Sequence, residues 1–150
     1  MNEKGMKMES RIEPLRYFDI GGNQVYVMRE DLLPFSLGGN KVRIGWEFFS
    51  DMQRQKKDCM VVYGNSRSNL CRVLANLCYA RKVPCYMISS REEGEEPQVT
   101  NNSRLMEWFH AEVIPCEKSQ IAITVEETME MLKKKGYHPY YIYGNKYGTG

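Results

Sequence analysis

A loop with two adjacent glycines directly before a lysine, in residues 29–43 (REDLLPFSLGGNKVR), constrains this chain most. Gly38 and Gly39 can adopt backbone conformations that are closed to other residues. Asn40 is a favourable N-cap residue and predicts that Lys41 lies in the first turn of a helix. A lysine held at such a junction can lose its water shell and act as a nucleophilic amine, although the simpler interpretation is a solvated lysine at a helix start.

Apolar runs alternate with amphipathic stretches along most of the chain. The continuous run 59–63 is typical of a strand covered on both faces, and residues 70–78 carry apolar side chains at helical spacing. Similar patterns predict helices over 41–57 and 102–110 and from 124 onward, and strands over 85–88, 112–115 and 140–143. The order β-α-β-α-β-α-β predicts an α/β fold with an open parallel sheet and helices on both faces.

Turn and cap signals add local detail. Gly21 and Gly22 predict a hairpin turn between two short strands within residues 17–28. Thr124 and Glu127 have the spacing of a capping box, and Gly136 is the expected residue after the end of that helix.

Composition narrows the class of protein. The length of 150 residues suits one domain, and the net charge of +2 does not favour nucleic acid or a membrane as a partner. No apolar stretch approaches the length of a membrane span, and residues 1–11 are charged and lack an apolar signal core, so we expect a cytoplasmic protein. Five cysteines without a C-x-x-C pair and two distant histidines give no support for a metal site, and the cysteines are interpreted as core residues.

Residues 29–43 resemble the run R-E-D-L-x-P-x-x-x-G-G-N-K-x-R of fold-type II pyridoxal phosphate (PLP) enzymes. The family that they resemble most is that of D-cysteine desulfhydrase and 1-aminocyclopropane-1-carboxylate (ACC) deaminase. The resemblance implies the tryptophan synthase beta-like PLP fold, with Lys41 as the lysine that carries the cofactor and Asn40 beside it as a further cofactor-binding residue.

Residues 64–72 (GNSRSNLCR) resemble a second motif of that family, G-x-x-Q-S-N-H-x-R. The resemblance implies that Asn69 bonds the 3′-oxygen of PLP, and that Ser68 joins Lys41 in the catalytic set by holding the substrate carboxylate. On the residues alone, the simpler interpretation is that Ser68 is an N-cap and that Asn69 is a solvated turn residue. Arg67 replaces the family's glutamine and Leu70 replaces its histidine. The resemblance therefore does not identify the substrate of this chain.

The resemblance covers only the front of the family's longer chains. It implies that residues 1–40 are the first strands and loop of a large PLP domain and that residues 41–150 form the small α/β domain, with the rest of the large domain absent. We therefore expect the N-terminal portion of a lyase or deaminase acting on a small amino acid, incomplete alone and prone to pair with a missing C-terminal half or a homodimer partner. Gly144, Gly148 and Gly150 could form a phosphate loop, but a glycine turn that precedes that loop is preferred. A non-catalytic α/β binding module is the alternative.

Overall fold

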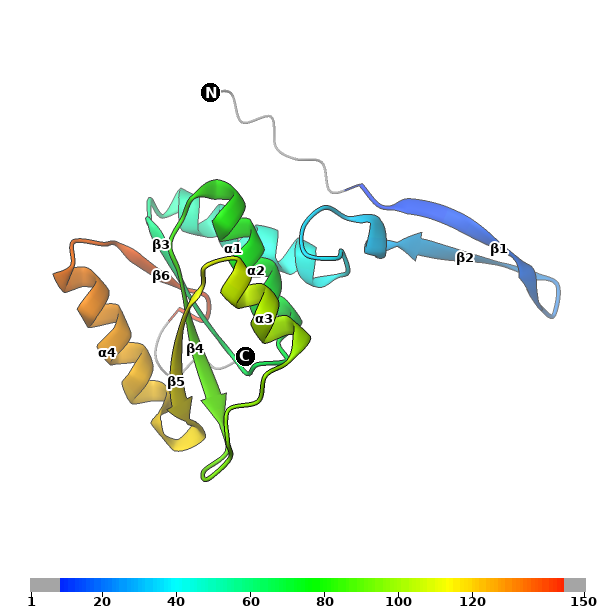
Figure 1. Ribbon diagram of the computed structural model, residues 1–150. Helices are drawn as coiled ribbons and strands as arrows, with labels where there is room; N and C mark the ends of the chain where they lie inside the picture. Colours follow the sequence, from blue (N-terminus) through cyan, green and yellow to red (C-terminus); the bar gives the residue numbers. More distant parts are fainter. Residues whose placement is uncertain (1–8, 145–150) are drawn as a thin grey trace.

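The computed structural model describes residues 9–144, which form a two-stranded ribbon and a four-stranded sheet covered by helices (Figure 1). The ribbon pairs strand β1 (Arg11–Ile20) with β2 (Asn23–Arg29) in antiparallel register. Gly21 and Gly22 connect them with φ angles of 61° and 79°, which confirms the predicted turn. The strands are longer than predicted, because β1 already begins at Arg11.

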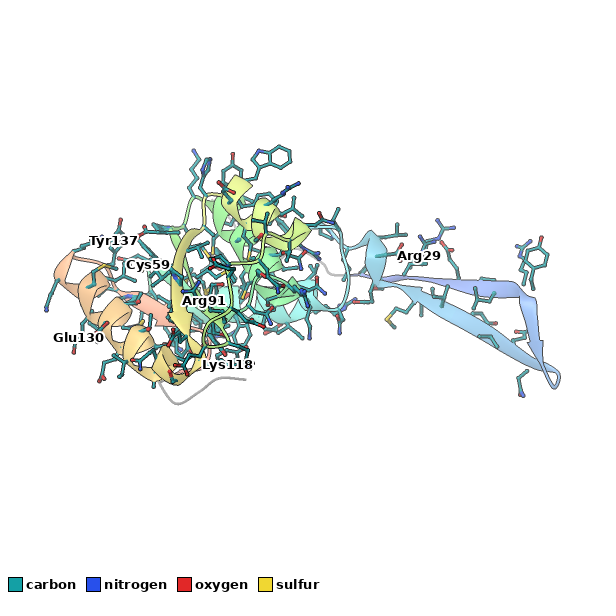
Figure 2. The ribbon with its side chains drawn as sticks, turned by 60° about the horizontal axis from the view of Figure 1, so that its bottom comes forward. Arg29, Cys59, Arg91, Lys118, Glu130 and Tyr137 are labelled. Atoms are coloured by element: carbon teal, nitrogen blue, oxygen red, sulfur yellow. The ribbon has the colours of Figure 1, made fainter. Side chains whose placement is uncertain are left out.

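The ribbon extends away from the rest of the molecule (Figure 1). Arg29 lies at its base (Figure 2), where the guanidinium bonds the Asp31 carboxylate at 2.7 Å and the Glu13 carboxylate at 3.1 Å. These two contacts join both strands to the short 3-10 turn Glu30–Leu32 that follows. The ribbon is therefore anchored to the body at one end only.

The main sheet has the strand order β5-β4-β3-β6, and every neighbouring pair is parallel. Its strands are β3 (Cys59–Gly64), β4 (Cys85–Arg91), β5 (Glu112–Glu117) and β6 (Pro139–Tyr141). The parallel sheet predicted from the β-α-β order is confirmed. The last strand is shorter than the predicted 140–143, since its pairing with β3 stops at Tyr141.

Helices cover both faces of this sheet, as predicted (Figure 1). They are α1 (Lys41–Arg54), α2 (Asn69–Arg81) and α3 (Asn101–Trp108) on one face and α4 (Ile121–Lys134) on the other. Alternate residues of β3 serve the two cores: Met60 and Val62 pack toward the first three helices, and Cys59 and Val61 toward α4. Within residues 9–144, no helix has the length and apolar character that crossing a membrane would need.

The predicted capping box at Thr124 is wrong. Helix α4 begins three residues earlier, directly after a 3-10 turn over Lys118–Gln120. Thr124 therefore lies inside the first turn, where its Oγ1 donates to the carbonyl oxygen of Gln120 at 2.9 Å. Gly136, with a φ of 90°, follows the C-terminal end of the helix and confirms that part of the prediction.

Gly45 allows α1 to lie close against α2. A Cβ built at this position would stand 2.9 Å from Val73 Cγ1 and 3.3 Å from Leu77 Cδ1. Any larger residue would push the two helices apart. This close packing fixes the start of α1, and with it Lys41, relative to α2.

Candidate functional site

Lys41 is the first residue of α1 and its side chain is half-buried. The preceding Asn40 does not cap the helix with its side chain, contrary to the prediction. Its backbone is already helical, with φ −57° and ψ −25°, whereas a capping side chain normally needs an extended backbone. The Val42 N–H instead donates to the carbonyl oxygen of Gly39 at 3.0 Å.

The five residues 35–39 all have positive φ angles, with values of 74°, 47°, 68°, 68° and 90°. Three of them, Phe35, Ser36 and Leu37, are not glycines, and each such residue costs about 1–2 kcal/mol in this region. The loop closes on itself through the Gly38 N–H, which donates to the Phe35 carbonyl oxygen at 3.0 Å. A loop of this shape persists only where its surroundings hold it, and such strain is typical of functional sites.

The surroundings do hold this loop from two sides. Two side chains of helix α2 bind Ser36. The Ser36 N–H donates to Asn76 Oδ1 at 2.8 Å, and Arg72 Nε donates to the Ser36 hydroxyl at 3.0 Å. On the opposite side, the Gly39 N–H donates to the Glu30 carbonyl oxygen at 2.7 Å. The loop that presents Lys41 is thus tied both to α2 and to the turn that follows the ribbon.

Ser68 is the N-cap of α2, as predicted. Its backbone is extended, with φ −63° and ψ 116°, and its Oγ accepts the Cys71 N–H at 3.2 Å. Gly64 makes room for this arrangement, because a Cβ there would stand 2.7 Å from Cys71 Sγ. The remaining N–H groups of the first turn and the helix dipole favour an anion at this point.

Asn69, the first residue of α2, is exposed, and its Oδ1 accepts from Asn102 Nδ2 at 3.0 Å. Asn102 lies in the first turn of α3, and its Oδ1 accepts from Arg72 Nη1 at 2.9 Å. Partial burial lowers the pKa of Arg72 from its usual value, and both of its partners, the Ser36 hydroxyl and the Asn102 amide, are neutral. Sequence reasoning missed Asn102, because no local signal links it to a residue 33 positions away.

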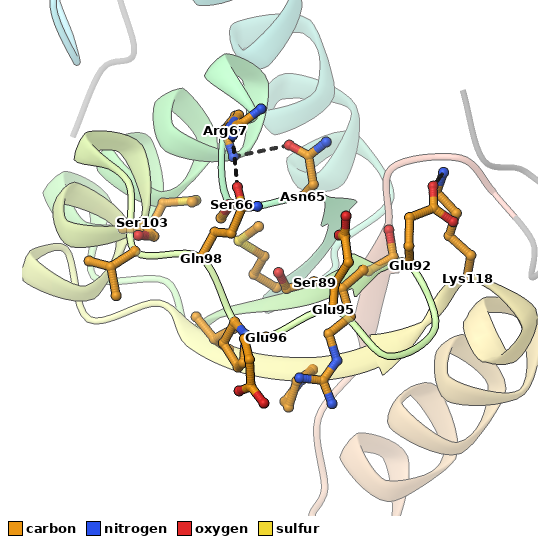
Figure 3. A pocket seen from close by; sticks show the side chains of 18 residues that line it. Asn65, Ser66, Arg67, Ser89, Glu92, Glu95, Glu96, Gln98, Ser103 and Lys118 are labelled. Atoms are coloured by element: carbon orange, nitrogen blue, oxygen red, sulfur yellow. Dashed lines mark hydrogen bonds and ion pairs between the residues drawn. The ribbon is translucent and has the colours of Figure 1, made fainter.

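A cavity of about 440 Å³ lies beside this segment, between the ends of β4 and β5 and the loop that leads into α3 (Figure 3). Asn65, Ser66 and Arg67 line it, and Arg67 Nη2 donates to Gln98 Oε1 at 2.7 Å. Ligand sites of parallel sheets occur at such carboxyl ends. Lys41, Ser68 and Asn69 do not line the cavity, so the structure brings Ser68 and Asn69 next to it along the chain but leaves the lysine outside.

Four of the five cysteines, Cys59, Cys71, Cys78 and Cys85, are buried core residues, as interpreted from the sequence, and Cys116 packs partly buried against the core. Burial raises the pKa of both Cys59 and Cys71 to about 12, so neither thiol ionises appreciably at neutral pH. The Cys71 thiol donates to the carbonyl oxygen of Tyr63 at 3.3 Å. In the part of the chain that the structure describes, no three potential metal ligands cluster together.

A parallel α/β sheet with a lysine and a serine–asparagine pair at two helix starts is the arrangement expected of a fold-type II PLP enzyme. The chain belongs to the family of pyridoxal-phosphate dependent enzymes, whose pattern matches residues 9–149. Two D-cysteine desulfhydrases, from Yersinia enterocolitica serotype O:8 and Serratia proteamaculans, are each 30% identical to it over 135 residues. The Yersinia match takes in 85% of this chain and 40% of the relative, so the chain spans well under half of the length of the curated relatives.

Two solved structures share the fold. A crystal structure of an ACC deaminase homologue superposes with a TM-score of 0.70 at 24% identity, over 89% of this chain and 41% of the other. A hydrogen sulfide-producing enzyme from Fusobacterium nucleatum gives 0.62 at 20% identity, over 89% and 42%. These findings confirm the predicted fold class and the resemblance, and PLP is the cofactor of the family to which the chain belongs.

Substitutions at Ser68 separate its capping role from anion binding. We expect Ser68→Ala to lower the free energy of unfolding by about 1 kcal/mol, because the Cys71 N–H loses its acceptor. Ser68→Asp keeps a capping oxygen and should retain wild-type stability, yet its charge should repel a carboxylate from the helix start. Urea unfolding of both variants measures the capping role, and wild-type stability of Ser68→Ala would show that Ser68 does not act as a cap.

Proposed function

We propose that this chain carries the lysine-bearing part of a PLP-dependent lyase or deaminase site for a small amino acid. The observation that supports this most is the placement of Lys41 at the start of α1, behind a strained loop that Arg72 and Asn76 of α2 hold. The same helix α2 begins with Ser68 and Asn69. The two motifs with cofactor and substrate roles in the resemblance are therefore joined by direct hydrogen bonds.

The residues present fit part of the cofactor. Lys41 offers a half-buried amine for covalent attachment, and Asn69 has an amide group that would bond the phenolic oxygen of PLP. Asn40 is exposed and makes no side-chain cap bond, which leaves its amide available beside the lysine. We assign the phosphate contacts to protein outside residues 9–144.

Bound PLP supplies an electron sink for the carbanion formed at the substrate Cα. In our proposal the Lys41 amine would take the proton from the Cα of a substrate such as D-cysteine and pass it to the departing sulfide as the Cβ–S bond breaks, since that Cα becomes the carbonyl carbon of the 2-oxo acid. The Ser68 hydroxyl and the N–H groups at the start of α2 hold the substrate carboxylate and orient the Cα–H bond.

The relatives named as D-cysteine desulfhydrases support a β-elimination. In that reaction D-cysteine and water give pyruvate, hydrogen sulfide and ammonia. Ring opening of ACC, whose Cα carries no hydrogen, would have to begin at another bond, and together with water it gives 2-oxobutanoate and ammonia. Arg67 lines the cavity next to Ser68 where the resemblance has a glutamine, and Leu70 packs against the core where it has a histidine. We therefore expect a substrate preference that differs from both.

We also propose that residues 1–40 belong to the large domain and residues 41–150 to the small one. A two-stranded hairpin is marginally stable by itself, and this ribbon exposes several large apolar side chains. They are Ile12, Leu15, Tyr17, Tyr26 and Met28. We assign them to contacts with the rest of the large domain, in a companion polypeptide or a homodimer partner. We place the protein in the cytoplasm, where free thiols such as its five cysteines stay reduced.

Reductive trapping tests the proposal. The chain is incubated with PLP, reduced with borohydride and digested, and we expect the phosphopyridoxyl group on the peptide that contains Lys41. The exposed Lys82 and Lys133 serve as internal controls for random labelling. The same samples, alone and mixed with the separately produced C-terminal part of the Yersinia relative, are assayed for sulfide and pyruvate from D-cysteine. Even labelling of all lysines would refute the proposal and favour a non-catalytic binding module built around the cavity.

A further inference from the structure

A chain of hydrogen bonds links the loop before Lys41 to Asn69 through two residues that have no assigned role. Arg72 Nε donates to the Ser36 hydroxyl at 3.0 Å, and Arg72 Nη1 donates to Asn102 Oδ1 at 2.9 Å. Asn102 Nδ2 then donates to Asn69 Oδ1 at 3.0 Å and to the Arg67 carbonyl oxygen at 2.7 Å. The series thus crosses from the lysine loop over α2 to the first turn of α3.

The order of donors and acceptors in this chain is fixed by Arg72. A guanidinium can only donate, so Asn102 must turn its amide oxygen toward Arg72. The NH₂ group of Asn102 then faces Asn69, which has to present its own oxygen in return. The NH₂ group of Asn69 consequently points away from Asn102, as a donor for another group.

The position of Asn102 is itself well determined. Thr100 and Ser103 form a reciprocal capping box at the start of α3, and Thr100 Oγ1 donates to the carbonyl oxygen of Ser66. This contact ties the start of α3 to the segment immediately before Ser68. Because Asn102 belongs to that first turn, the contact places it next to the start of α2.

We propose that Arg72 and Asn102 are positioning residues of the site. Asn102 keeps the amide of Asn69 in the orientation that offers a hydrogen-bond donor to the phenolic oxygen of PLP. Arg72 fixes the orientation of Asn102 and at the same time holds the strained loop that presents Lys41. The part that concerns PLP rests on the proposed function, whereas the orientation of Asn69 and the anchoring of the loop do not.

The test uses Asn102→Asp with Asn101→Asp as its matched control. Both variants add the same charge to the first turn of α3, and Asn101 is exposed and has no side-chain hydrogen bond in the described chain. The carboxylate that Asn102→Asp introduces still accepts from Arg72 but cannot donate to Asn69, whose amide should turn its NH₂ group inward. In nitrogen-15 NMR spectra we expect the side-chain amide signals of Asn69 to shift in Asn102→Asp and to stay unchanged in Asn101→Asp.

The same pair of variants is compared in PLP titrations with borohydride trapping at Lys41. Loss of a hydrogen bond to a charged oxygen should weaken apparent PLP affinity about 10-fold to 100-fold in Asn102→Asp and leave Asn101→Asp near wild type. Arg72→Lys is the second variant, because it keeps the charge but cannot reach two partners at once. It should speed hydrogen exchange at the Ser36 and Gly39 amides about 10-fold or more.

The outcomes distinguish the two proposals. If the wild-type chain traps PLP at Lys41 and Asn102→Asp equals Asn101→Asp in both affinity and Asn69 signals, the positioning role is overturned and the proposed function stands. If the wild-type chain traps no PLP, the proposed function fails, and the Asn69 signals and loop exchange decide the positioning role. Unchanged signals in Asn102→Asp together with unchanged exchange in Arg72→Lys would overturn it in that case.

Discussion

Replacing Gly38 with alanine is expected to lower the free energy of unfolding by about 3 kcal/mol or more. Gly38 is buried with a φ of 68°, and a Cβ there would stand 2.3 Å from the Asp31 carbonyl oxygen and 2.6 Å from its carbon. Those atoms are backbone and cannot move aside cheaply. The left-handed conformation adds its own cost for any residue with a Cβ.

Gly39→Ala is the matched control for this effect. Gly39 has a φ of 90°, but nothing lies within 4 Å of a Cβ built on it. Gly39→Ala should therefore lower the free energy of unfolding only by the cost of the left-handed conformation, about 1–2 kcal/mol. Urea unfolding gives the two values, and hydrogen exchange over residues 36–41 shows whether Gly38→Ala also releases the loop before Lys41. Equal destabilisation by the two variants would mean that the contact with Asp31 is not tight.

The regular elements were predictable because they depend on local patterns. The apolar run at 59–63 was typical of a doubly covered strand, and the spacing of apolar residues in 70–78 matched one face of a helix. Boundaries were less accurate where two local signals competed. At Thr124 a capping-box pattern was present, but the preceding 3-10 turn had already started the helix at Ile121.

The candidate site was predictable only in part, for a physical reason. Ser68 and Lys41 were placed correctly at helix starts, because caps and glycine loops leave local signals. The left-handed conformation of Phe35, Ser36 and Leu37 left none, since these residues avoid it intrinsically and adopt it here through contacts with α2. Asn102 is a similar case, because its role depends on the packing of α3 beside α2 and not on its neighbours in sequence.

The loop therefore has to be understood as part of α2 rather than as a flexible connection. Its strain is offset by the bonds from Asn76 and Arg72, so the start of α1 moves only if α2 moves with it. Rigidity of this kind suits a covalent attachment point, since the amine must meet a ring held by other residues. This rigidity also predicts that a lysine at a neighbouring position cannot take over the role proposed for Lys41.

Removing the amine of Lys41 is expected to abolish covalent trapping of PLP, the largest functional effect that we predict. Lys41→Arg keeps the positive charge and the helix start, but a guanidinium stays protonated and cannot act as the nucleophile. Lys41→Ala removes the group altogether. Because Lys41 is half-buried at the first turn of α1, neither change should unfold the chain, and thermal unfolding checks this.

The matched control for Lys41 is Lys57→Arg, a lysine of similar burial just beyond the end of α1. After incubation with PLP and borohydride reduction, mass spectrometry should find the label in the wild-type chain and in Lys57→Arg, and not in either Lys41 variant. Labelling of a Lys41 variant at the wild-type level would place the reactive amine elsewhere. In that event the strained loop would have to serve another purpose, because its residues hold no other lysine between the ribbon and α1.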